Sequence, residues 1–285
     1  MSLSVPAVTI ALPVFNAEKT LKKAILSIID QSFTDWELLL LDDGSSDSSQ
    51  IIARQVTDAR VRVISDGVNR GISFRLNQAV QMARGRYFCR MDADDISFPG
   101  RIEAQLNFLE KYPLIDLVAT SIVTLDSSGR PLGVVGVATH HAEICARPWN
   151  GFHFPHPTWF GRTEWFRRHA YSSAADGSED QLLLYSTYEG SKFAGIPQVL
   201  LGYRDDRRTF GKMFGRRLSF WKAIGGHALR NRKLQDLVFL SIFQPAKIVA
   251  DFLNIKLGIA VLRNKQVPPD RDLVEMCRKF DLNRE

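Results

Sequence analysis

Short apolar runs alternate with segments of helical periodicity through the first half of the chain. Residues 8–12 form a run rich in β-branched side chains that ends at Pro13, and the apolar side chains of 18–29 recur at helical spacing. The same alternation predicts further strands at 37–41, 61–64 and 87–91, and further helices around 51–52 and over 72–83 and 99–111. Strands and helices in this rhythm predict a doubly wound α/β fold, Rossmann-like, with a mainly parallel sheet.

The second half of the chain continues the sheet and then becomes helical. Its patterns predict a strand at 117–125 with a hairpin partner at 131–139, a helix at 181–188, and two short strands at 193–196 and 199–203. From Gly211 onward the pattern is mostly helical, with a break expected at Pro245 and a polar end after Pro268. We therefore predict an α/β domain at 1–210, divided into halves of about 1–125 and 126–210, and a basic helical extension at 211–285.

Composition adds bounds but no function. A chain of 285 residues with 45% hydrophobic and 24% charged side chains can bury a full core as one large domain or one domain with an appendage. The three cysteines, Cys89, Cys145 and Cys277, are widely spaced and odd in number, which fits neither a disulfide framework nor a zinc ligand set. A reducing compartment is therefore expected.

The net charge of +6 is unevenly distributed along the chain. From Arg207 to the end there are 17 Lys+Arg and 7 Asp+Glu, so residues 1–206 carry 20 basic and 24 acidic side chains. A basic segment with apolar stripes suits anionic lipid or an acidic acceptor. Nucleic acid is not expected as a partner, because nothing in the sequence resembles a nucleic-acid-binding motif.

No segment of the sequence is expected to span a membrane or direct secretion. The uncharged stretch 1–17 has no basic start and is interrupted by Pro6 and Pro13, so we interpret it as a tail followed by a buried strand. The apolar run 237–246 has half the length that a bilayer requires. We expect a cytoplasmic protein that can lie at the inner face of the cell membrane.

An acidic cluster follows directly after the predicted strand at 87–91. Asp92, Asp94 and Asp95 place three carboxylates within four residues, and their mutual repulsion is costly unless a divalent cation or hydrogen-bond donors lie among them. In open α/β sheets, ligands bind beyond the carboxyl ends of strands. The cluster therefore predicts a cation site, with a solvated acidic loop as the alternative.

Five sequence blocks, taken in order, resemble the family 2 glycosyltransferases. The blocks are residues 8–18, Leu41-Asp42-Asp43-Gly44-Ser45-Ser46-Asp47, Asn69-Arg70-Gly71, Ala83-Arg84-Gly85-Arg86-Tyr87 and Met91-Asp92-Ala93-Asp94-Asp95. Members of this family are inverting enzymes with the GT-A fold that use nucleotide sugars. The resemblance covers roughly residues 7–205, since Glu179-Asp180 extends it into the second half, and the chain after about Gly211 matches nothing.

The resemblance implies a nucleotide site at the ends of the first two strands. Asp43 would accept a hydrogen bond from the imide N–H of a uracil or thymine ring. The backbone around Pro13, Val14 and Phe15 would hold the same ring, with Glu18 nearby. The alternative is that the Asp-Asp-Gly segment only forms a turn and caps a helix.

The resemblance also implies how the diphosphate would be held. Asp94 and Asp95 would reach Mn²⁺ or Mg²⁺ and the nucleotide, while Asp92 would share this task or orient the other two. Oxygen ligands suit a hard cation that stabilises the charge of the leaving group. Arg75, on the helix after Asn69-Arg70-Gly71, would assist the phosphates, with an exposed helix arginine as the alternative.

In the second half, the resemblance assigns acid–base chemistry to Asp180, which matches the aspartate of the family's Glu-Asp motif. Asp180 would be the general base for the acceptor hydroxyl, and its competing role is N-capping of a helix along with Ser178 and Glu179. His156 and Glu179 would lie on the acceptor side. His153 and His156 do not indicate zinc, because no third ligand follows at useful spacing. Tyr203-Arg204 would contact the diphosphate or close the sheet.

The extension at 211–285 contains a candidate surface helix. Apolar side chains such as Phe214 and Trp221 alternate with basic ones such as Arg216 and Lys222, a pattern that predicts a basic amphipathic helix. Such a helix suits peripheral membrane contact near a lipid-linked acceptor. Packing against the catalytic domain or in a homodimer remains open.

The sequence therefore predicts a metal-dependent inverting glycosyltransferase that uses a UDP- or dTDP-sugar. Its acceptor would be a saccharide or a lipid-linked saccharide, and a role in bacterial surface polysaccharide synthesis is implied only by the resemblance. One alternative is a nucleotidyltransferase, which would need a glycine-rich triphosphate loop that residues 13–16 do not offer. The other is a catalytically inactive nucleotide- or sugar-binding module.

Overall fold

The computed structural model describes residues 5–204, 210–257 and 267–282. One mixed sheet runs through this part of the chain. Its strands are β1 (Val8–Val14), β2 (Trp36–Asp42), β3 (Val61–Ser65), β4 (Tyr87–Arg90), β5 (Ile96–Ser97), β6 (Leu117–Leu125), β7 (Pro131–Val135), β8 (Phe160–Arg162) and β9 (Phe193–Arg204). The strand order is β3-β2-β1-β4-β8-β6-β9-β5, with β7 paired to β6.

Helices follow the strands as the alternating pattern predicts. They are α1 (Leu21–Ile29), α2 (Ser49–Arg54), α3 (Ile72–Met82), α4 (Arg101–Lys111), α5 (His141–Ile144), α6 (Thr163–Arg168), α7 (Glu179–Thr187), α8 (Phe210–Arg230), α9 (Leu234–Leu257) and α10 (Arg271–Leu282). Short 3₁₀ turns lie at Pro148–Asn150, His156–Thr158 and Ser173–Ala175. Helix α1 begins three residues after the predicted start at Glu18, and α4 begins two residues after the predicted start at Pro99.

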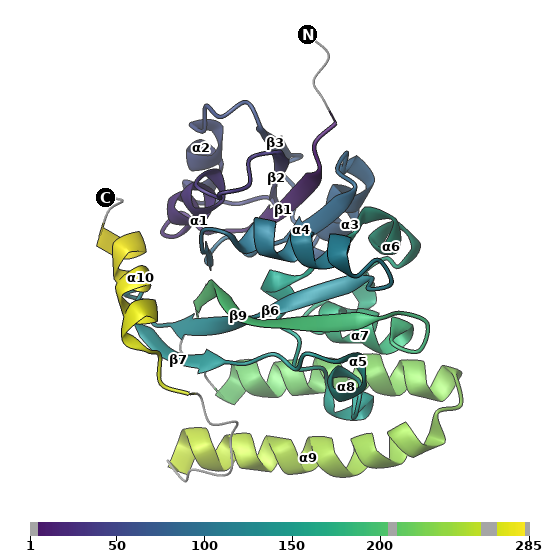
Figure 1. The fold of residues 1–285 in the computed structure, drawn as a ribbon. Helices are drawn as coiled ribbons and strands as arrows, with labels where there is room; N and C mark the ends of the chain where they lie inside the picture. Colours follow the sequence, from purple (N-terminus) through teal and green to yellow (C-terminus); the bar gives the residue numbers. More distant parts are fainter. Residues whose placement is uncertain (1–4, 205–209, 258–266, 283–285) are drawn as a thin grey trace.

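The sheet is mainly parallel and covered on both faces, which confirms the predicted fold class. Strands β3, β2, β1 and β4 pair in parallel, as do β6 and β9, whereas β5, β7 and β8 run antiparallel to their neighbours. Helices α1 and α4 contribute to the apolar core on one face, and α3, α6, α7 and α8 to the core on the other. Figure 1 shows these layers. The carboxyl ends of β1, β2 and β4 therefore meet at one edge.

Two details of the prediction were wrong. The two short strands expected at 193–196 and 199–203 are one strand, β9, because shifts in its register with β6 around Ser121 absorb the irregularity at Pro197. The break expected at Pro245 does not occur, since α9 runs through this residue. Pro245 is exposed, so its ring lies on the solvent side of the helix and not in the core. The chain turns instead at Asn231–Lys233, between α8 and α9.

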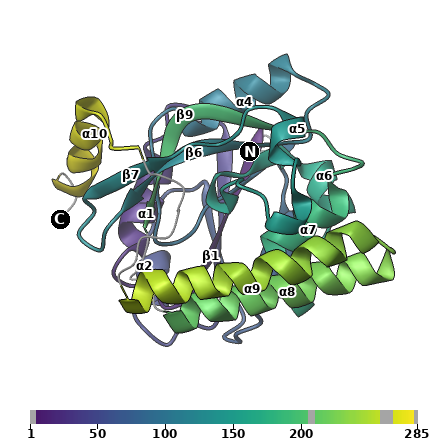
Figure 2. The ribbon, with the colours of Figure 1, turned by 90° about the horizontal axis from the view of Figure 1, so that it is seen from below.

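The helical extension packs on the α/β layers, and its polar end carries one apolar face. Side chains of α8, namely Phe220, Ile224 and Ala228, are buried in the same core as α7. Helix α10 places Leu273 and Cys277 against the apolar ends of β5 and β6. Figure 2 shows the α8–α9 pair and α10 on different sides of the sheet. Among the described helices, none combines the length and apolar character needed to cross a bilayer.

Candidate active site

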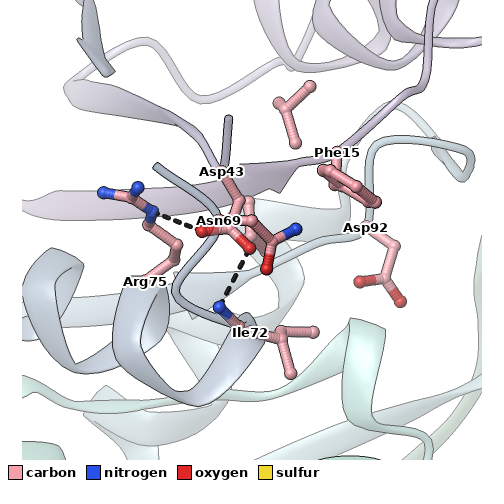
Figure 3. Close-up of a pocket in the computed structure, with 9 residues that line it drawn as sticks. Phe15, Asp43, Asn69, Ile72, Arg75 and Asp92 are labelled. Carbon is pink, nitrogen blue, oxygen red and sulfur yellow. Dashed lines mark hydrogen bonds and ion pairs between the residues drawn. The ribbon is translucent and has the colours of Figure 1, made fainter. Parts of the chain in front are cut away.

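A cavity of about 270 Å³ opens where β1 and β2 end and α3 begins (Figure 3). It lies beyond the carboxyl ends of these strands, where the sequence analysis expected a nucleotide, and its walls are mainly apolar with a few polar side chains. Its lining residues are Pro13, Val14, Phe15, Asp43, Asn69, Gly71, Ile72, Arg75 and Asp92. The cavity therefore joins the two sequence blocks after β1 and β2 to the first aspartate of the acidic cluster.

The walls of the cavity depend on close contact between two loops. Gly44 has φ of +72°, and a Cβ there would lie 2.7 Å from the backbone nitrogen of Asn69, so only glycine permits this approach. Asp42 joins the ends of β2 and β3, since one of its oxygens accepts the Ser65 hydroxyl at 2.8 Å and the other accepts the Ser45 N–H at 3.2 Å. Asp42 thus has the turn-forming role considered for both aspartates.

Asp43 instead points into the cavity (Figure 3). Its Oδ1 accepts the Arg70 N–H at 2.8 Å and the Arg75 Nε–H at 2.8 Å, and its Oδ2 accepts the Gly71 N–H at 3.0 Å. A carboxylate oxygen can accept two hydrogen bonds, so Oδ2 retains capacity for one donor from a ligand. The loop thereby fixes the direction of a carboxylate that lines the cavity.

Arg75 is fully buried, so the alternative of an exposed helix arginine is wrong. Besides Asp43, its guanidinium donates to Asp66 Oδ1 at 2.5 Å, to the Val68 carbonyl at 2.6 Å and to Gln78 Oε1 at 3.0 Å. These bonds engage all three guanidinium nitrogens and fix the loop before α3. The direct contacts of Arg75 are therefore with the carboxylate of Asp43 and with this loop.

Glu18 does not line the cavity, although the sequence placed it near the nucleotide. Its carboxylate accepts the Ser48 N–H at 3.1 Å, and its own N–H donates to Asp47 Oδ2 at 3.0 Å. These bonds join the loop after β1 to the start of α2. Glu18 thus lies beside the cavity and supports one of its walls.

The three aspartates of the acidic cluster converge after β4. One carboxylate oxygen from each of Asp92, Asp94 and Asp95 lies within 4.8 Å of the others. Asp95 is fully buried: its Oδ1 accepts the Arg204 N–H at 3.0 Å, whereas its Oδ2 has no partner among the described residues. Burial raises the pKa of Asp95 well above its usual range, and the charges of Asp92 and Asp94 add to this effect.

This donor set fits a divalent cation. Buried polar atoms are almost always hydrogen-bonded, so the unpartnered Asp95 Oδ2 calls for a ligand. A hard cation such as Mn²⁺ or Mg²⁺ would satisfy that oxygen and reduce the repulsion among the three carboxylates. Because Asp92 also lines the cavity, the cation would lie at its edge.

Two arginines that the sequence analysis overlooked or left open support the cluster. Arg90, at the end of β4, is buried and pairs with Asp92, and the charges of Asp95 and Glu179 also act on it. Arg204 ends β9, and its Nε donates to the Asp94 carbonyl at 3.0 Å. Arg204 therefore joins the end of β9 to the acidic cluster. A charged residue at the end of the apolar run 87–89 was the available signal for Arg90.

A further buried arginine, which the sequence analysis did not identify, supports the backbone just before the acidic cluster. Arg101 in α4 donates to the Arg90 carbonyl at 2.7 Å and to the Pro157 carbonyl at 2.9 Å, while Gln105 donates to the Thr158 carbonyl at 2.7 Å. These bonds fix the end of β4 to the 3₁₀ turn His156–Thr158. Its signal was weak, because two polar residues at i and i+4 are typical of exposed helix faces.

The Glu-Asp pair begins α7. Asp180 does not cap this helix, because its Oδ2 accepts the Gln181 side-chain N–H at 2.9 Å, and the N-cap residue is Ser178. Glu179 is buried and accepts the Gly177 N–H at 2.7 Å. Neither carboxylate lines the cavity of Figure 3, so the structure does not bring Asp180 into the nucleotide site itself.

His156 connects α7 to the segment that precedes it. It is buried, its Nε2 lies 3.0 Å from the Tyr171 hydroxyl, and its Nδ1 lies 3.9 Å from Glu179 Oε1. Burial and then the charge of Arg90 lower the pKa of His156 well below its usual range, so the ring is neutral near pH 7. Asn77 of α3 holds the Tyr171 backbone with two hydrogen bonds of 2.8 and 2.9 Å.

The protonation of Glu179 gives a testable pH dependence. Burial, followed by the charge of Asp180, raises the pKa of Glu179 from 4.5 to about 7. The folded state therefore binds a proton that the unfolded state releases between these values, and stability falls as the pH rises through this window. We expect Glu179→Gln to remove on the order of 2 kcal/mol of the difference in unfolding free energy between pH 5 and pH 8.

Urea denaturation at the two pH values measures this difference. Glu110→Gln, which removes an exposed glutamate of α4, is the matched control and should leave the difference as in the wild type. An unchanged pH dependence in Glu179→Gln would contradict a raised pKa for this carboxyl.

Comparison with known families identifies the chain. The profile of glycosyl transferase family 2 matches residues 9–169, which is more than half of the sequence. The chain belongs to glycosyl transferase family 2. The residues matched include the cavity of Figure 3, the acidic cluster and His156, whereas α7 and the helical extension lie beyond them.

Curated relatives of this family 2 chain include a putative glycosyltransferase, EpsE, of Bacillus subtilis, 38% identical over 127 residues that make up 44% of this chain and 46% of EpsE. A glucosyltransferase of Escherichia coli, WfgD, named for transfer from UDP-Glc to GlcNAc-diphosphoundecaprenol, is 33% identical over 104 residues, or 36% of this chain and 41% of WfgD. The chain thus spans less than half the length of these relatives.

Solved structures support the GT-A fold. TarS 1–349 of S. aureus in complex with UDP-GlcNAc has a TM-score of 0.56 and 16% identity, covering 88% of this chain and 74% of that one. The mannosyltransferase PcManGT of Pyrobaculum calidifontis, in complex with GDP-Man and Mn²⁺, has a TM-score of 0.61 and 16% identity, covering 90% and 76%. At this identity the likeness establishes the fold alone.

Proposed function

We propose that the protein is an inverting, metal-assisted glycosyltransferase that moves a sugar from a UDP- or dTDP-sugar to a saccharide or lipid-linked saccharide. The observation that carries this proposal is the buried oxygen of Asp95, which has no partner among the described residues, in an acidic cluster whose first member, Asp92, also lines the cavity of Figure 3. The name of the relative WfgD, a glucosyltransferase acting on GlcNAc-diphosphoundecaprenol, favours a lipid-linked saccharide acceptor and with it a role in bacterial polysaccharide synthesis.

The base of the nucleotide would bind at Asp43. Its Oδ2 accepts a single hydrogen bond, from Gly71, and retains capacity for the imide N–H of uracil or thymine. Pro13, Val14 and Phe15 would form the opposite wall. Arg75 would act through Asp43 by holding its carboxylate, since its own nitrogens are engaged by protein atoms.

The diphosphate would be bound with the cation held by Asp92, Asp94 and Asp95. When bound, the cation would supply Lewis-acid stabilisation of the charge on the departing diphosphate. Arg90 would orient Asp92, and Arg204 would fix the backbone of Asp94 and the carboxylate of Asp95. Such rigid support keeps the oxygens at distances that suit a cation.

Asp180 would remove the proton of the acceptor hydroxyl. The acceptor oxygen forms a bond to the anomeric carbon while the bond from that carbon to the diphosphate oxygen breaks, so the nucleoside diphosphate leaves with the electron pair. The proton passes to Asp180, and the configuration inverts because a single displacement occurs. Glu179 and His156 would line the acceptor side, where neutral His156 adds no positive charge.

A thermal-shift panel tests the donor. UDP, dTDP and GDP are compared with and without Mn²⁺. We expect UDP or dTDP to raise the melting temperature by about 5 °C at a hundredfold excess over the dissociation constant, and only when the metal is present. A larger shift with GDP would contradict the assignment of Asp43, and shifts that do not need metal would contradict the role of the acidic cluster.

The same preparation separates the rival functions. A catalytically inactive binding module would show the thermal shift but no hydrolysis of UDP-sugars in the presence of Mn²⁺. A nucleotidyltransferase would need to bind a nucleoside triphosphate in preference to a diphosphate. Slow donor hydrolysis together with a preference for diphosphates is the result expected of a glycosyltransferase.

A further inference from the structure

The outer face of α9 is apolar and exposed. Leu234, Val238, Ile242 and Val249 recur at spacings of four and seven residues, and their side chains are 57–68% exposed. Figure 1 shows α9 as the outermost element on this side of the molecule, and Figure 2, seen from below, shows it in front of α8. Exposed apolar surface arranged in a continuous row marks an interaction site and is not ordinary protein surface.

The inner side of the same helix is already used. Leu240 is buried against Gly225 of α8, and Lys247 donates to the Asn150 carbonyl at 2.8 Å. Phe239 and Phe243 lie 4.9 and 4.7 Å from the ring of Trp149. The apolar side chains of the outer face therefore stay exposed although the inner side of α9 is packed on the protein.

The net charge of the α8–α9 pair indicates which kind of partner would bind the apolar row. Residues 210–253 contain eight Lys and Arg but only two acidic residues. Both acidic side chains have partners in the protein, since Asp236 accepts the Tyr185 hydroxyl at 2.5 Å and Asp251 pairs with Arg217 at 3.1 Å. Among the basic side chains, Lys233 pairs with Glu189 and Lys247 donates to the Asn150 carbonyl. The helix pair that carries the apolar row therefore has a net positive charge, which complements an anionic lipid surface, whereas two copies of the same pair would bring like charges together.

The α8–α9 pair also borders the acceptor side. The Ser219 hydroxyl of α8 donates to the Asp176 carbonyl at 3.2 Å, four residues before Asp180. Phe220 of α8 packs close to Gly151, because a Cβ added at Gly151 would lie 3.4 Å from the Phe220 ring. A surface on which α9 lies would therefore be near the start of α7.

We propose that the outer face of α9, with the basic side chains of α8, is a docking surface for an anionic lipid bilayer. The helix lies along the interface with Leu234, Val238, Ile242 and Val249 among the acyl chains, and it does not cross the membrane. The placement next to α7 suits a lipid-linked acceptor, a point that rests on the proposed function. The lipid contact itself rests only on the exposed apolar row and the charge.

Vesicle sedimentation of the full chain tests the surface. Vesicles of phosphatidylcholine with phosphatidylglycerol are compared with phosphatidylcholine alone. We expect the protein to sediment with the anionic vesicles, and the double variant Val238→Glu/Ile242→Glu to bind them at least about tenfold more weakly. Leu114→Glu, which changes an exposed leucine of the catalytic half, is the matched control and should bind as the wild type does.

The charge is tested separately with Lys222→Gln/Arg230→Gln, which removes two exposed basic side chains of α8. At low salt we expect about tenfold weaker binding to the anionic vesicles, with the difference reduced at high salt. Equal binding to both kinds of vesicle, or none, would overturn the proposal. So would a discrete lipid-free dimer that Val238→Glu/Ile242→Glu converts to monomer, because the row would then be a subunit interface.

Vesicle binding needs no donor, metal or turnover. A protein that binds lipid but transfers no sugar would refute the proposed function and leave the docking surface standing. A protein that transfers sugar but does not bind vesicles would refute the docking surface and leave the proposed function standing.

Discussion

Asp180→Ala is expected to retain binding of the nucleotide donor but to lose sugar transfer by about 10²–10⁴-fold, the usual contribution of a general base. Donor binding should persist because Asp180 does not line the nucleotide cavity, and within the described part of the chain its carboxylate accepts a hydrogen bond from the side chain of its neighbour Gln181. The measurement pairs a transfer assay with the metal-dependent thermal shift of the donor complex. A variant that loses both would show only that α7 had been disturbed.

Glu179→Gln is the variant that tests the competing assignment. Glu179 has a pKa of about 7, the range in which a general base is most effective, so it is the competing candidate for the proton acceptor. If Asp180→Ala retained turnover and Glu179→Gln lost it, Glu179 would be the base. If Asp180 is the base, Glu179→Gln should remain active and shift only the pH dependence of the rate.

Asp95→Asn should abolish the effect of metal on donor binding. The substitution keeps the shape of the side chain and an oxygen for the Arg204 N–H, but it removes the charge of a buried carboxylate whose Oδ2 has no partner among the described residues. Without metal the variant should be at least as stable as the wild type near pH 8, because a buried charge among three carboxylates is costly. With Mn²⁺ and UDP, its melting temperature should not rise.

Two further variants sharpen this test. Asp94→Ala should also lose the metal-dependent shift, since Asp94 belongs to the same set of oxygens. Asp272→Asn removes an exposed carboxylate at the start of α10 and should retain the full shift. A normal response to Mn²⁺ in Asp95→Asn would mean that the cation binds elsewhere or that Asp95 only supports the fold.

The sequence predicted the parts of the site that follow directly from strand ends. Each of the blocks at Pro13, Asp43 and Asp92 comes after an apolar run, and parallel strands bring their carboxyl ends to one edge, so their meeting in one cavity follows from local pattern and sheet geometry. The fold class depended on the same alternation. These predictions needed no knowledge of which distant segments pack together.

What the sequence did not reveal depends on contacts between distant segments. Arg101 looks like an ordinary residue of an exposed helix face, and its burial depends on contacts with Arg90 and Pro157, which are distant in the chain. Arg75 was placed on the phosphates, whereas the structure surrounds it with acceptors from the loop before α3. The continuous strand β9 likewise depends on β6, which tolerates a shifted register beside Pro197.

The burial of α8 has a practical consequence for work with shorter versions of the protein. The family match ends at residue 169, and the pattern of strands ends at β9, so a boundary near 210 looks natural from alignment. Phe220, Ile224 and Ala228 nevertheless fill the core beside α7. Truncation before α8 would expose the apolar side of α7 to solvent and promote aggregation. Shortened versions of the protein should therefore keep both long helices.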